Sequence, residues 1–307
     1  MKDKIKIFSP ATVSNVCCGF DVLGFAINGI GDELTISKSQ SSGVKIKDIN
    51  GFTVPKEVDK NTATIAANAM LNNLGINDGF DLVINKKIKP GSGIGSSAAS
   101  AVGAVYGINE LLDRPFEKNQ LLKFAIKGEF ISASNAPADN VASALYGGLV
   151  LVNNKEDYRV TKLPAPANLH AVIHHPLIEI NTHTSRLSLP KSIKLNNVSN
   201  QLASIAGFIH SLHTSDLELM KSSLKDYLVE KNRSIYVPIF DKVKKVAELN
   251  NALCCSISGS GPSIFSLVSS INQAQKLKTL IDKEYINEKV KFNSYITSLR
   301  SKGVREI

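Results

Sequence analysis

The sequence predicts an α+β protein built from two domains, and three observations support this prediction. The chain has 307 residues, which is long for a single hydrophobic core. Short segments with the hydrophobic pattern of strands are interspersed with longer segments of helical composition. A proline-broken stretch at residues 163–167 separates the two halves, so we expect domains at residues 1–163 and 164–307.

In the first half, residues 4–8 alternate charged and apolar side chains, which is typical of a half-buried strand. Residues 62–74 are rich in Ala, Met and Leu and contain no Gly or Pro, which indicates a helix. Period and composition likewise predict the other elements, strands at 33–37, 44–49, 80–88 and 147–152 and helices at 97–112, 117–132 and 139–146.

In the second half, Gly259 and Gly261 mark a turn between two apolar runs, which predicts strands at 252–258 and 263–268. The remaining elements are a strand at 170–174 and helices at 200–212, 217–228, 237–249 and 271–285. The four cysteines form two adjacent pairs and lack zinc-binding spacing, so we expect free thiols.

The most informative motif is residues 89–100, which read KPGSGIGSSAAS. Gly91, Gly93 and Gly95 let the backbone turn back on itself and expose its N–H groups. Because a predicted strand precedes the loop and a predicted helix follows it, these donors lie at a helix N-terminus, where the dipole favours an anion. Neighbouring lysines favour phosphate as that anion. The alternative is a flexible Gly/Ser turn.

The loop matches neither of the two commonest phosphate-binding patterns. A Walker A loop carries a Lys directly after its last glycine, and a dinucleotide-binding turn has G-x-G-x-x-G, whereas the spacing here is G-x-G-x-G. Two hydroxyl residues, Ser96 and Ser97, follow the glycines. They can either cap the helix or bind Mg²⁺ beside a triphosphate.

The pattern of residues 90–98 resembles the second motif of the GHMP kinases. Residues 9–24, SPATVSNVCCGFDVLG, resemble the first motif of that family, and residues 257–263, ISGSGPS, resemble the third. The motifs stand in the family's order, and the likeness covers essentially the whole chain. The homoserine kinase branch is the most similar, on the segments ADNVA at 138–142 and INT at 180–182 and on Arg186, Glu230 and Arg233.

This resemblance implies a two-domain GHMP kinase fold, with an N-terminal part like domain 2 of ribosomal protein S5 and a ferredoxin-like C-terminal part. It implies an ATP- and Mg²⁺-dependent phosphotransferase that converts L-homoserine to O-phospho-L-homoserine in threonine biosynthesis, and that forms a homodimer. The alternatives are another kinase of the family with a small hydroxyl substrate, such as mevalonate, and a non-enzymatic ligand- or nucleic-acid-binding protein.

The resemblance also assigns residues to the nucleotide, by their match to the family's motifs. Ser97 and Glu129 would bind Mg²⁺, and Asn61 and Lys86 would lie near the adenine and ribose. The positions assigned to ATP are Asn61, Lys86, Pro90, Gly91, Ser92, Gly93, Ile94, Gly95, Ser96, Ser97, Ala98 and Ala99.

On the acceptor side, the resemblance assigns two arginines to a substrate carboxylate, which suits the planar guanidinium, and two aspartates to a substrate ammonium. Asn140 and Glu129 are assigned to catalysis. Because an amide cannot act as a base, we expect Asn140 to position the acceptor hydroxyl, and whether Asp139 assists is left open. The substrate positions are Asn15, Asp21, Asp139, Asn140, Thr182, Arg186, Arg233 and Gly259.

Three departures from the branch's pattern concern the substrate pocket. Pro137 stands where many homoserine kinases have His, the pair Cys17-Cys18 replaces small or proline residues, and Lys231 replaces a proline.

The net charge of +9 suits anionic small molecules or nucleic acid. The lysines are scattered, aromatic residues make up 6% of the chain and no nucleic-acid motif is present, so we expect no nucleic-acid partner. No run approaches the roughly 18 apolar residues of a membrane span. The N-terminus has no secretory pattern, which favours the cytoplasm.

Overall fold

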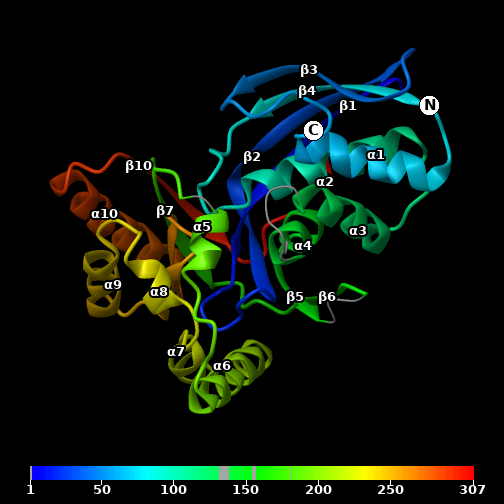
Figure 1. The fold of residues 1–307 in the computed structure, drawn as a ribbon. Helices are drawn as coiled ribbons and strands as arrows, with labels where there is room; N and C mark the ends of the chain where they lie inside the picture. The colour runs from blue at the N-terminus through cyan, green and yellow to red at the C-terminus, as the bar shows by residue number, and fades with distance from the viewer. Residues whose placement is uncertain (1, 131–137, 154–156, 181) are drawn as a thin grey trace.

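The computed structural model describes residues 2–130, 138–153, 157–180 and 182–307, without the side chains of 182–184 (Figure 1). Most of the first half forms one mixed sheet in the order β11-β1-β2-β4-β3, and β5 pairs with β2 and β6. Only β3 and β4 are parallel among these described pairs. The strands are β1 (Lys4–Ser14), β2 (Leu23–Ser39), β3 (Gly43–Gly51), β4 (Gly79–Lys86), β5 (Leu149–Asn153), β6 (Arg159–Leu163) and β11 (Arg305–Glu306).

Helices cover one face of this sheet, with α2 at the centre (Figure 1). Helix α2 packs on the other three helices and on β1 and β2, and its own small residues, mostly Ala and Gly, allow that close approach. Gly103 and Gly107 face Leu34 and Ile36 of β2, where an added Cβ would come within 2.6 Å and 2.4 Å of side-chain carbons. The helices are α1 (Thr62–Leu74), α2 (Ser96–Leu111), α3 (Lys118–Glu129) and α4 (Ala138–Tyr146).

The second half forms an antiparallel sheet in the order β10-β7-β9-β8. Helices α9 and α10 pack together against it, and α6 packs against α7 at the lower end of the view in Figure 1. The elements are β7 (His170–Pro176), α5 (Thr182–Leu187), α6 (Leu195–Thr214), α7 (Leu217–Ser223), α8 (Glu230–Ser234), α9 (Phe240–Leu249), β8 (Cys254–Ile257), β9 (Ile264–Val268), α10 (Ile271–Asn287) and β10 (Phe292–Ser298).

The two sheets share one of the three hydrophobic clusters. Phe25 of β2 meets Phe265 of β9 edge to face, with ring centroids 6.0 Å apart, and both side chains are fully buried. The chain also crosses back at its end, because β11 pairs with β1 of the first sheet. The proposed division at residue 163 therefore stays a prediction. Residues 164–298 supply all four strands of the second sheet, whereas Arg305–Glu306 belong to the first.

Most predicted elements are confirmed, and helix 62–74 is confirmed to the residue. The predicted helix 217–228 is wrong beyond Ser223, where α7 ends. The carboxylate of Asp226 accepts hydrogen bonds from the N–H groups of Leu228, Val229 and Glu230, at 2.7, 2.9 and 3.2 Å, and these bonds hold a turn in place of a continued helix. The sequence analysis missed α5, α8, β6, β10 and β11. Residues 131 and 132 of the predicted helix 117–132 lie outside the described residues.

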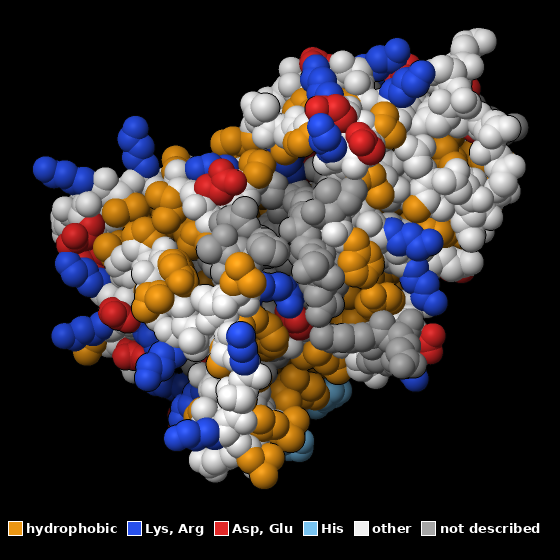
Figure 2. Space-filling view, in the orientation of Figure 1, with side chains coloured by type: hydrophobic (Ala, Val, Ile, Leu, Met, Phe, Trp, Pro, Cys, Tyr) orange, Lys and Arg blue, Asp and Glu red, His pale blue; other side chains and the backbone are white. Residues whose placement is uncertain are grey.

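Lys and Arg side chains are spread over the face shown in Figure 2 and do not gather into one patch there. The positive net charge is thus dispersed on this face. Of the helices in the described ranges, none has both the length and the apolar composition needed to cross a bilayer.

Candidate active site

A cavity of about 350 Å³ collects most of the residues that the sequence analysis assigned to ligands. Its lining includes Asn15, Asp21, Asn61, Lys86, Pro90, Gly91, Ser92, Gly93, Gly95, Ser96, Ser97, Glu129, Asn140, Arg186, Arg233 and Gly259. Four assigned residues, Ile94, Ala98, Ala99 and Asp139, are buried and do not line it. The side chain of Thr182 and the whole of Pro137 lie outside the described part of the chain.

The glycine-rich loop runs from the end of β4 to the start of α2, as the sequence predicts. Gly91, Gly93 and Gly95 all have positive φ angles, of 66°, 76° and 70°, a backbone conformation that residues other than glycine rarely adopt. Space is restricted as well. A Cβ on Gly93 would lie 2.6 Å from the carbonyl oxygen of Gly261, and one on Gly95 would lie 2.1 Å from Oγ1 of Thr12. The loop therefore requires glycine at these positions for both conformation and contact.

The second glycine turn, at residues 258–263, holds this loop from the side of the second sheet. The hydroxyl of Ser258 donates to the carbonyl of Gly93 at 2.7 Å, and the hydroxyl of Ser263 donates to that of Ser92 at 2.6 Å. From the first sheet, the N–H of Thr12 donates to the carbonyl of Ile94 at 3.1 Å. These bonds engage the loop's carbonyls and leave its N–H groups unused, apart from a long 3.5 Å bond from the N–H of Ile94 to Oγ of Ser92.

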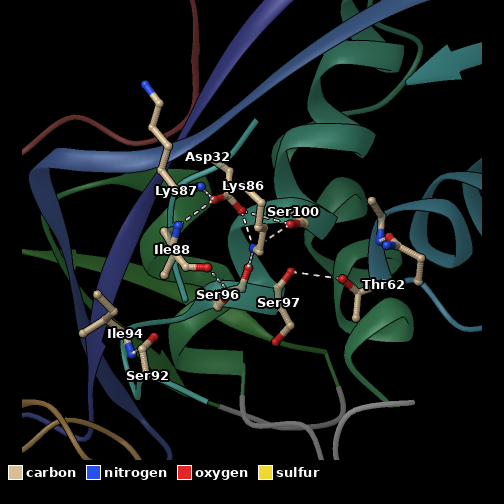
Figure 3. Close-up of polar contacts among 12 residues, drawn as sticks. Asp32, Thr62, Lys86, Lys87, Ile88, Ser92, Ile94, Ser96, Ser97 and Ser100 are labelled. Atoms are coloured by element: carbon tan, nitrogen blue, oxygen red, sulfur yellow. Dashed lines mark hydrogen bonds and ion pairs between the residues drawn. The ribbon is translucent and has the colours of Figure 1, made fainter. Parts of the chain in front are cut away.

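A buried network lies at the base of the loop (Figure 3). The Lys86 ammonium pairs with the Asp32 carboxylate, and both side chains are almost completely buried. The same ammonium donates to Oγ of Ser100 at 2.9 Å and to the carbonyl oxygen of Ser96 at the start of α2. Lys86 is among the residues that line the cavity, and its assignment to the nucleotide stays a prediction.

Two oxygen donors suited to a hard cation lie beside the loop. Ser97, in the first turn of α2, donates a 2.8 Å hydrogen bond to Oε2 of Glu129 at the end of α3. Thr62 donates to the carbonyl of Ser97 at 3.3 Å and so fixes the turn. Burial raises the pKa of Glu129 to about 7, since a carboxylate loses solvation there. A nearby cation would offset that cost, so the pair fits Mg²⁺, which takes one or two protein oxygens beside phosphate and water.

Within the described chain, no cluster of three or more His, Cys, Asp or Glu side chains could hold a metal ion. The Ser97–Glu129 pair therefore fits only a cation that receives its other ligands from a substrate and from water. Magnesium bound together with a nucleotide has that coordination.

The other end of the cavity carries charged side chains. One nitrogen of the Arg186 guanidinium donates to both carboxylate oxygens of Asp21, at 3.1 Å and 3.2 Å. Arg233 lies over the ring of Phe20, 5.4 Å from its centroid, and donates to the carbonyl of Gly259 at 2.7 Å. Its Nε is buried and has no hydrogen-bond partner among the described residues. This end therefore presents two guanidinium groups and a carboxylate.

Helix α4 begins at the middle of the cavity with two functional candidates. The carboxylate of Asp139 accepts from the N–H of Asn15 at 3.2 Å and from the N–H of Asn140 at 2.8 Å. Burial, together with the negative charge of Asp21, raises the pKa of Asp139 to about 7. Asn140 accepts a 2.7 Å hydrogen bond on Oδ1 from the hydroxyl of Thr12. Its amide NH₂ group is therefore left to donate into the cavity that Asn140 lines.

The first motif leaves β1 through a turn of unusual backbone conformation. Asn15, Val16 and Cys17 have φ angles of 70°, 43° and 58°, and a β-branched residue such as Val16 rarely adopts this region. The side chain of Asn15 stabilises the turn, because Oδ1 accepts from the N–H of Asp21 at 3.1 Å and Nδ2 donates to the carbonyl of Gly259 at 3.4 Å. Strained backbone of this kind is typical of functional sites, and here it directs Asp21 toward Arg186.

Comparisons with known proteins identify the family of the chain. A model described as the GHMP kinases N terminal domain matches residues 61–148, and one described as GHMP kinases C terminal matches residues 208–287. A homoserine kinase of Chlorobium phaeobacteroides (strain BS1) is 37% identical over 314 residues, which covers 98% of each chain. The chain belongs to the GHMP kinase family.

Solved GHMP kinases share the fold. A crystal structure of homoserine kinase from Cytophaga hutchinsonii matches with a TM-score of 0.96 at 45% identity, and covers 100% of this chain and 98% of that one. The L. major mevalonate kinase in complex with R-mevalonate matches with a TM-score of 0.72 at 16% identity, over 97% and 98% of the two chains. The predicted two-domain GHMP kinase fold is thereby confirmed.

The cysteines of this GHMP kinase are free and buried, as the sequence predicts. Burial raises the pKa of the Cys18 and Cys255 thiols, so both stay protonated at neutral pH. Burial raises the pKa of the Cys17 thiol as well, so the departure at Cys17-Cys18 from the branch's pattern places two buried, unreactive side chains within the first motif.

The sequence analysis did not assign Thr12, Asp32 and Ser100, nor several other residues that line the cavity, namely Ser14, Val54, Pro55, Lys60, Thr62 and Ser260. Thr12 belongs to the first motif, and its contact with Asn140 spans 128 positions along the chain. Asp32 lies in the middle of β2, where a single sequence gives no functional signal, whereas Ser100 is the last residue of the glycine-rich motif, near the start of α2. Arg233 and Gly259, both assigned to the substrate by the resemblance, line the same cavity, and their roles there stay predictions.

Proposed function

We propose that this GHMP kinase transfers the γ-phosphoryl group of ATP to the side-chain hydroxyl of L-homoserine and so forms O-phospho-L-homoserine in threonine biosynthesis. One observation carries the proposal. The cavity joins a phosphate-binding loop to a cluster of two arginines and an aspartate, and relatives named homoserine kinase align with this chain over nearly its whole length.

The charged end of the cavity suits a zwitterionic amino acid. Homoserine carries a carboxylate and an ammonium on the same carbon, so its recognition needs a cation and an anion side by side. Arg186 and Asp21 form such a pair. Arg233 adds a second guanidinium. Its buried Nε has no hydrogen-bond partner within the described part of the chain, and a substrate carboxylate would provide one. We assign the carboxylate to the two arginines and the ammonium to Asp21. Asp139, which the resemblance also assigned to the ammonium, is fully buried and does not line the cavity, so it would act on the ammonium only through its charge.

Asn140 lies between the two ends and is the residue we assign to the acceptor hydroxyl. Its amide NH₂ group can donate to that oxygen but cannot take its proton. Catalysis would then depend on alignment and on charge stabilisation by the loop's N–H groups and the dipole of α2, which is what phosphoryl transfer mainly requires. The proton would leave to phosphate or water.

Ser97 and Glu129 are the residues that would hold Mg²⁺. A bound magnesium ion neutralises phosphate charge during phosphoryl transfer. The part played by the chain is to present the Ser97 hydroxyl and the Glu129 carboxylate together at the first turn of α2, next to the loop.

The proposal is tested by a coupled assay of ADP release with Mg²⁺-ATP and, in turn, homoserine, mevalonate, galactose and shikimate. We expect turnover with homoserine and background rates with the other three, which lack its ammonium group. Turnover with mevalonate but not with homoserine would contradict the assignment of the acceptor and would leave the family unchanged.

Two further proposals concern the protein as a whole. A homodimer would be detected by size-exclusion chromatography with light scattering, and a mass equal to one chain would contradict it. A cytoplasmic location would be tested by fractionation of cells that express the protein.

A further inference from the structure

Asp32 is a buried charge in the middle of β2 that neither the motifs nor the proposed mechanism uses. Its side chain is fully buried, and both of its oxygens are occupied. Oδ1 accepts the N–H groups of Lys87 and Ile88, at 3.0 Å and 3.1 Å. Oδ2 accepts the Lys86 ammonium and, at 3.0 Å, the hydroxyl of Ser100 (Figure 3).

These contacts lie at the two ends of the phosphate-binding loop. Lys87 and Ile88 lead from β4 into the loop, and Ser100 lies in the first turns of α2, into which the loop runs. Two further hydrogen bonds connect the same two ends of the loop. The hydroxyl of Ser96 donates to the carbonyl of Ile88 at 2.8 Å, and the Lys86 ammonium donates to the carbonyl of Ser96. One carboxylate thus ties both ends of the loop together.

We propose that Asp32 is a positioning residue for nucleotide binding, which closes the base of the phosphate-binding loop and holds the Lys86 ammonium against the first turn of α2. The inference rests on the proposed function only in taking the nucleotide as the ligand of the loop. A loop fixed before binding loses less conformational freedom when phosphate enters, and its N–H groups are already directed at the ligand.

The charge of Asp32 matters as well as its hydrogen bonds. A buried ammonium without a partner is costly, so Lys86 depends on Asp32 to stay at this position. An amide at position 32 would present hydrogen-bond donors where the carboxylate accepts from Lys86 and Ser100. The Asp32→Asn variant would therefore loosen α2 from β4 and displace the ammonium.

The test compares ATP affinity, measured by calorimetry without an acceptor, in the wild type and in Asp32→Asn. Hydrogen bonds to a charged group lead us to expect an affinity roughly tenfold to a hundredfold weaker. The KM for homoserine should stay within about twofold of the wild-type value.

The matched control is Glu33→Gln, one position along the same strand, which removes exposed ion pairs with Lys6 and Lys87. It should leave ATP affinity within about twofold.

A lower melting temperature with unchanged ATP affinity would reduce Asp32 to a purely structural residue and overturn the proposal. If Asp32→Asn does not fold, two milder variants decide the question. Ser100→Ala removes only the hydroxyl shared by Asp32 and Lys86. The double variant Asp32→Asn/Lys86→Met removes both charges of the buried pair, so that neither is left without its partner. Both should bind ATP more weakly, and wild-type affinity in both would overturn the proposal. Because calorimetry needs no acceptor, this result does not depend on whether homoserine is the substrate.

Discussion

The hydroxyl of Thr12 donates a 2.7 Å hydrogen bond to Oδ1 of Asn140. Thr12 is fully buried and also lies against Gly95, where a Cβ would come within 2.1 Å of its hydroxyl oxygen. One side chain therefore contacts both the phosphate-binding loop and the residue assigned to the acceptor hydroxyl. This relationship connects the donor and acceptor halves of the cavity.

We predict that Thr12→Val lowers kcat while the KM values for ATP and homoserine stay within about twofold. Valine has nearly the same shape but cannot donate, so the amide of Asn140 loses the bond that orients it. Loss of one buried hydrogen bond costs about 1–3 kcal/mol, which corresponds to roughly tenfold to a hundredfold in rate. Thr12→Ser keeps the donor and should retain most of the activity. Equal kcat values in the wild type and in Thr12→Val would remove Thr12 from the catalytic arrangement.

Arg186→Lys should raise the KM for homoserine and leave the KM for ATP nearly unchanged. Lysine keeps the charge but loses the planar group that can bind a carboxylate through two parallel bonds. We expect a penalty of about 1–3 kcal/mol, or roughly tenfold to a hundredfold in KM, from steady-state kinetics. If neither Arg186→Lys nor Arg186→Ala changes the KM for homoserine, Arg186 does not bind the substrate carboxylate.

Ser97→Ala and Glu129→Gln should each increase the Mg²⁺ concentration needed for half-maximal rate. The first variant removes an oxygen ligand, and the second removes the negative charge that attracts the cation. The measurement is a magnesium titration of the initial rate at saturating ATP and homoserine. Wild-type rates at low Mg²⁺ in either variant would exclude that residue from the proposed metal site.

The buried carboxyl groups predict how stability depends on pH. The pKa of Glu129 is raised to about 7 in the folded protein, whereas an unfolded chain has the ordinary value of about 4.3. The folded state therefore binds more protons between these values, and this group's contribution to stability is lost as the pH rises from about 4 to about 7. The effect should be largest in protein free of nucleotide and metal.

Glu129→Gln removes this titration. Thermal unfolding between pH 5 and pH 8 should therefore show a smaller loss of stability with rising pH in the variant than in the wild type. Asp139, whose pKa is also raised to about 7, remains in both proteins and supplies the residual slope. Identical pH profiles would show that Glu129 does not titrate in this range.

The elements that could be predicted from the sequence are those set by residues close to one another in the chain. The helix 62–74 and the strand, loop and helix around residues 79–111 follow from composition and from glycine spacing, because those signals act between near neighbours in the chain. The end of α7 at Ser223 could not be predicted in this way, since the hydrogen bonds of Asp226 compete with a sequence that suits a helix.

The site was predicted where motif residues themselves line the cavity, and missed where one side chain orients another. Asp32 resembles any charged residue of an alternating strand, and its role depends on contacts with residues 54 to 68 positions away. Strands β10 and β11 were missed for a similar reason. Their pairing partners, β7 and β1, lie more than a hundred residues earlier in the chain.

The hydroxyls of Ser258 and Ser263 donate hydrogen bonds to the carbonyls of Gly93 and Ser92, and these bonds have a thermodynamic consequence. The glycine-rich loop is part of the proposed nucleotide site and, through these bonds, part of the contact between the two sheets. Free-energy coupling between two such equilibria is reciprocal. If a nucleotide binds this loop conformation preferentially, its binding stabilises the contact between the two sheets. That contact, in turn, strengthens nucleotide binding by the same free energy. Amide hydrogen exchange at β8 and β9, which flank the turn at residues 258–263, should therefore slow when ATP binds.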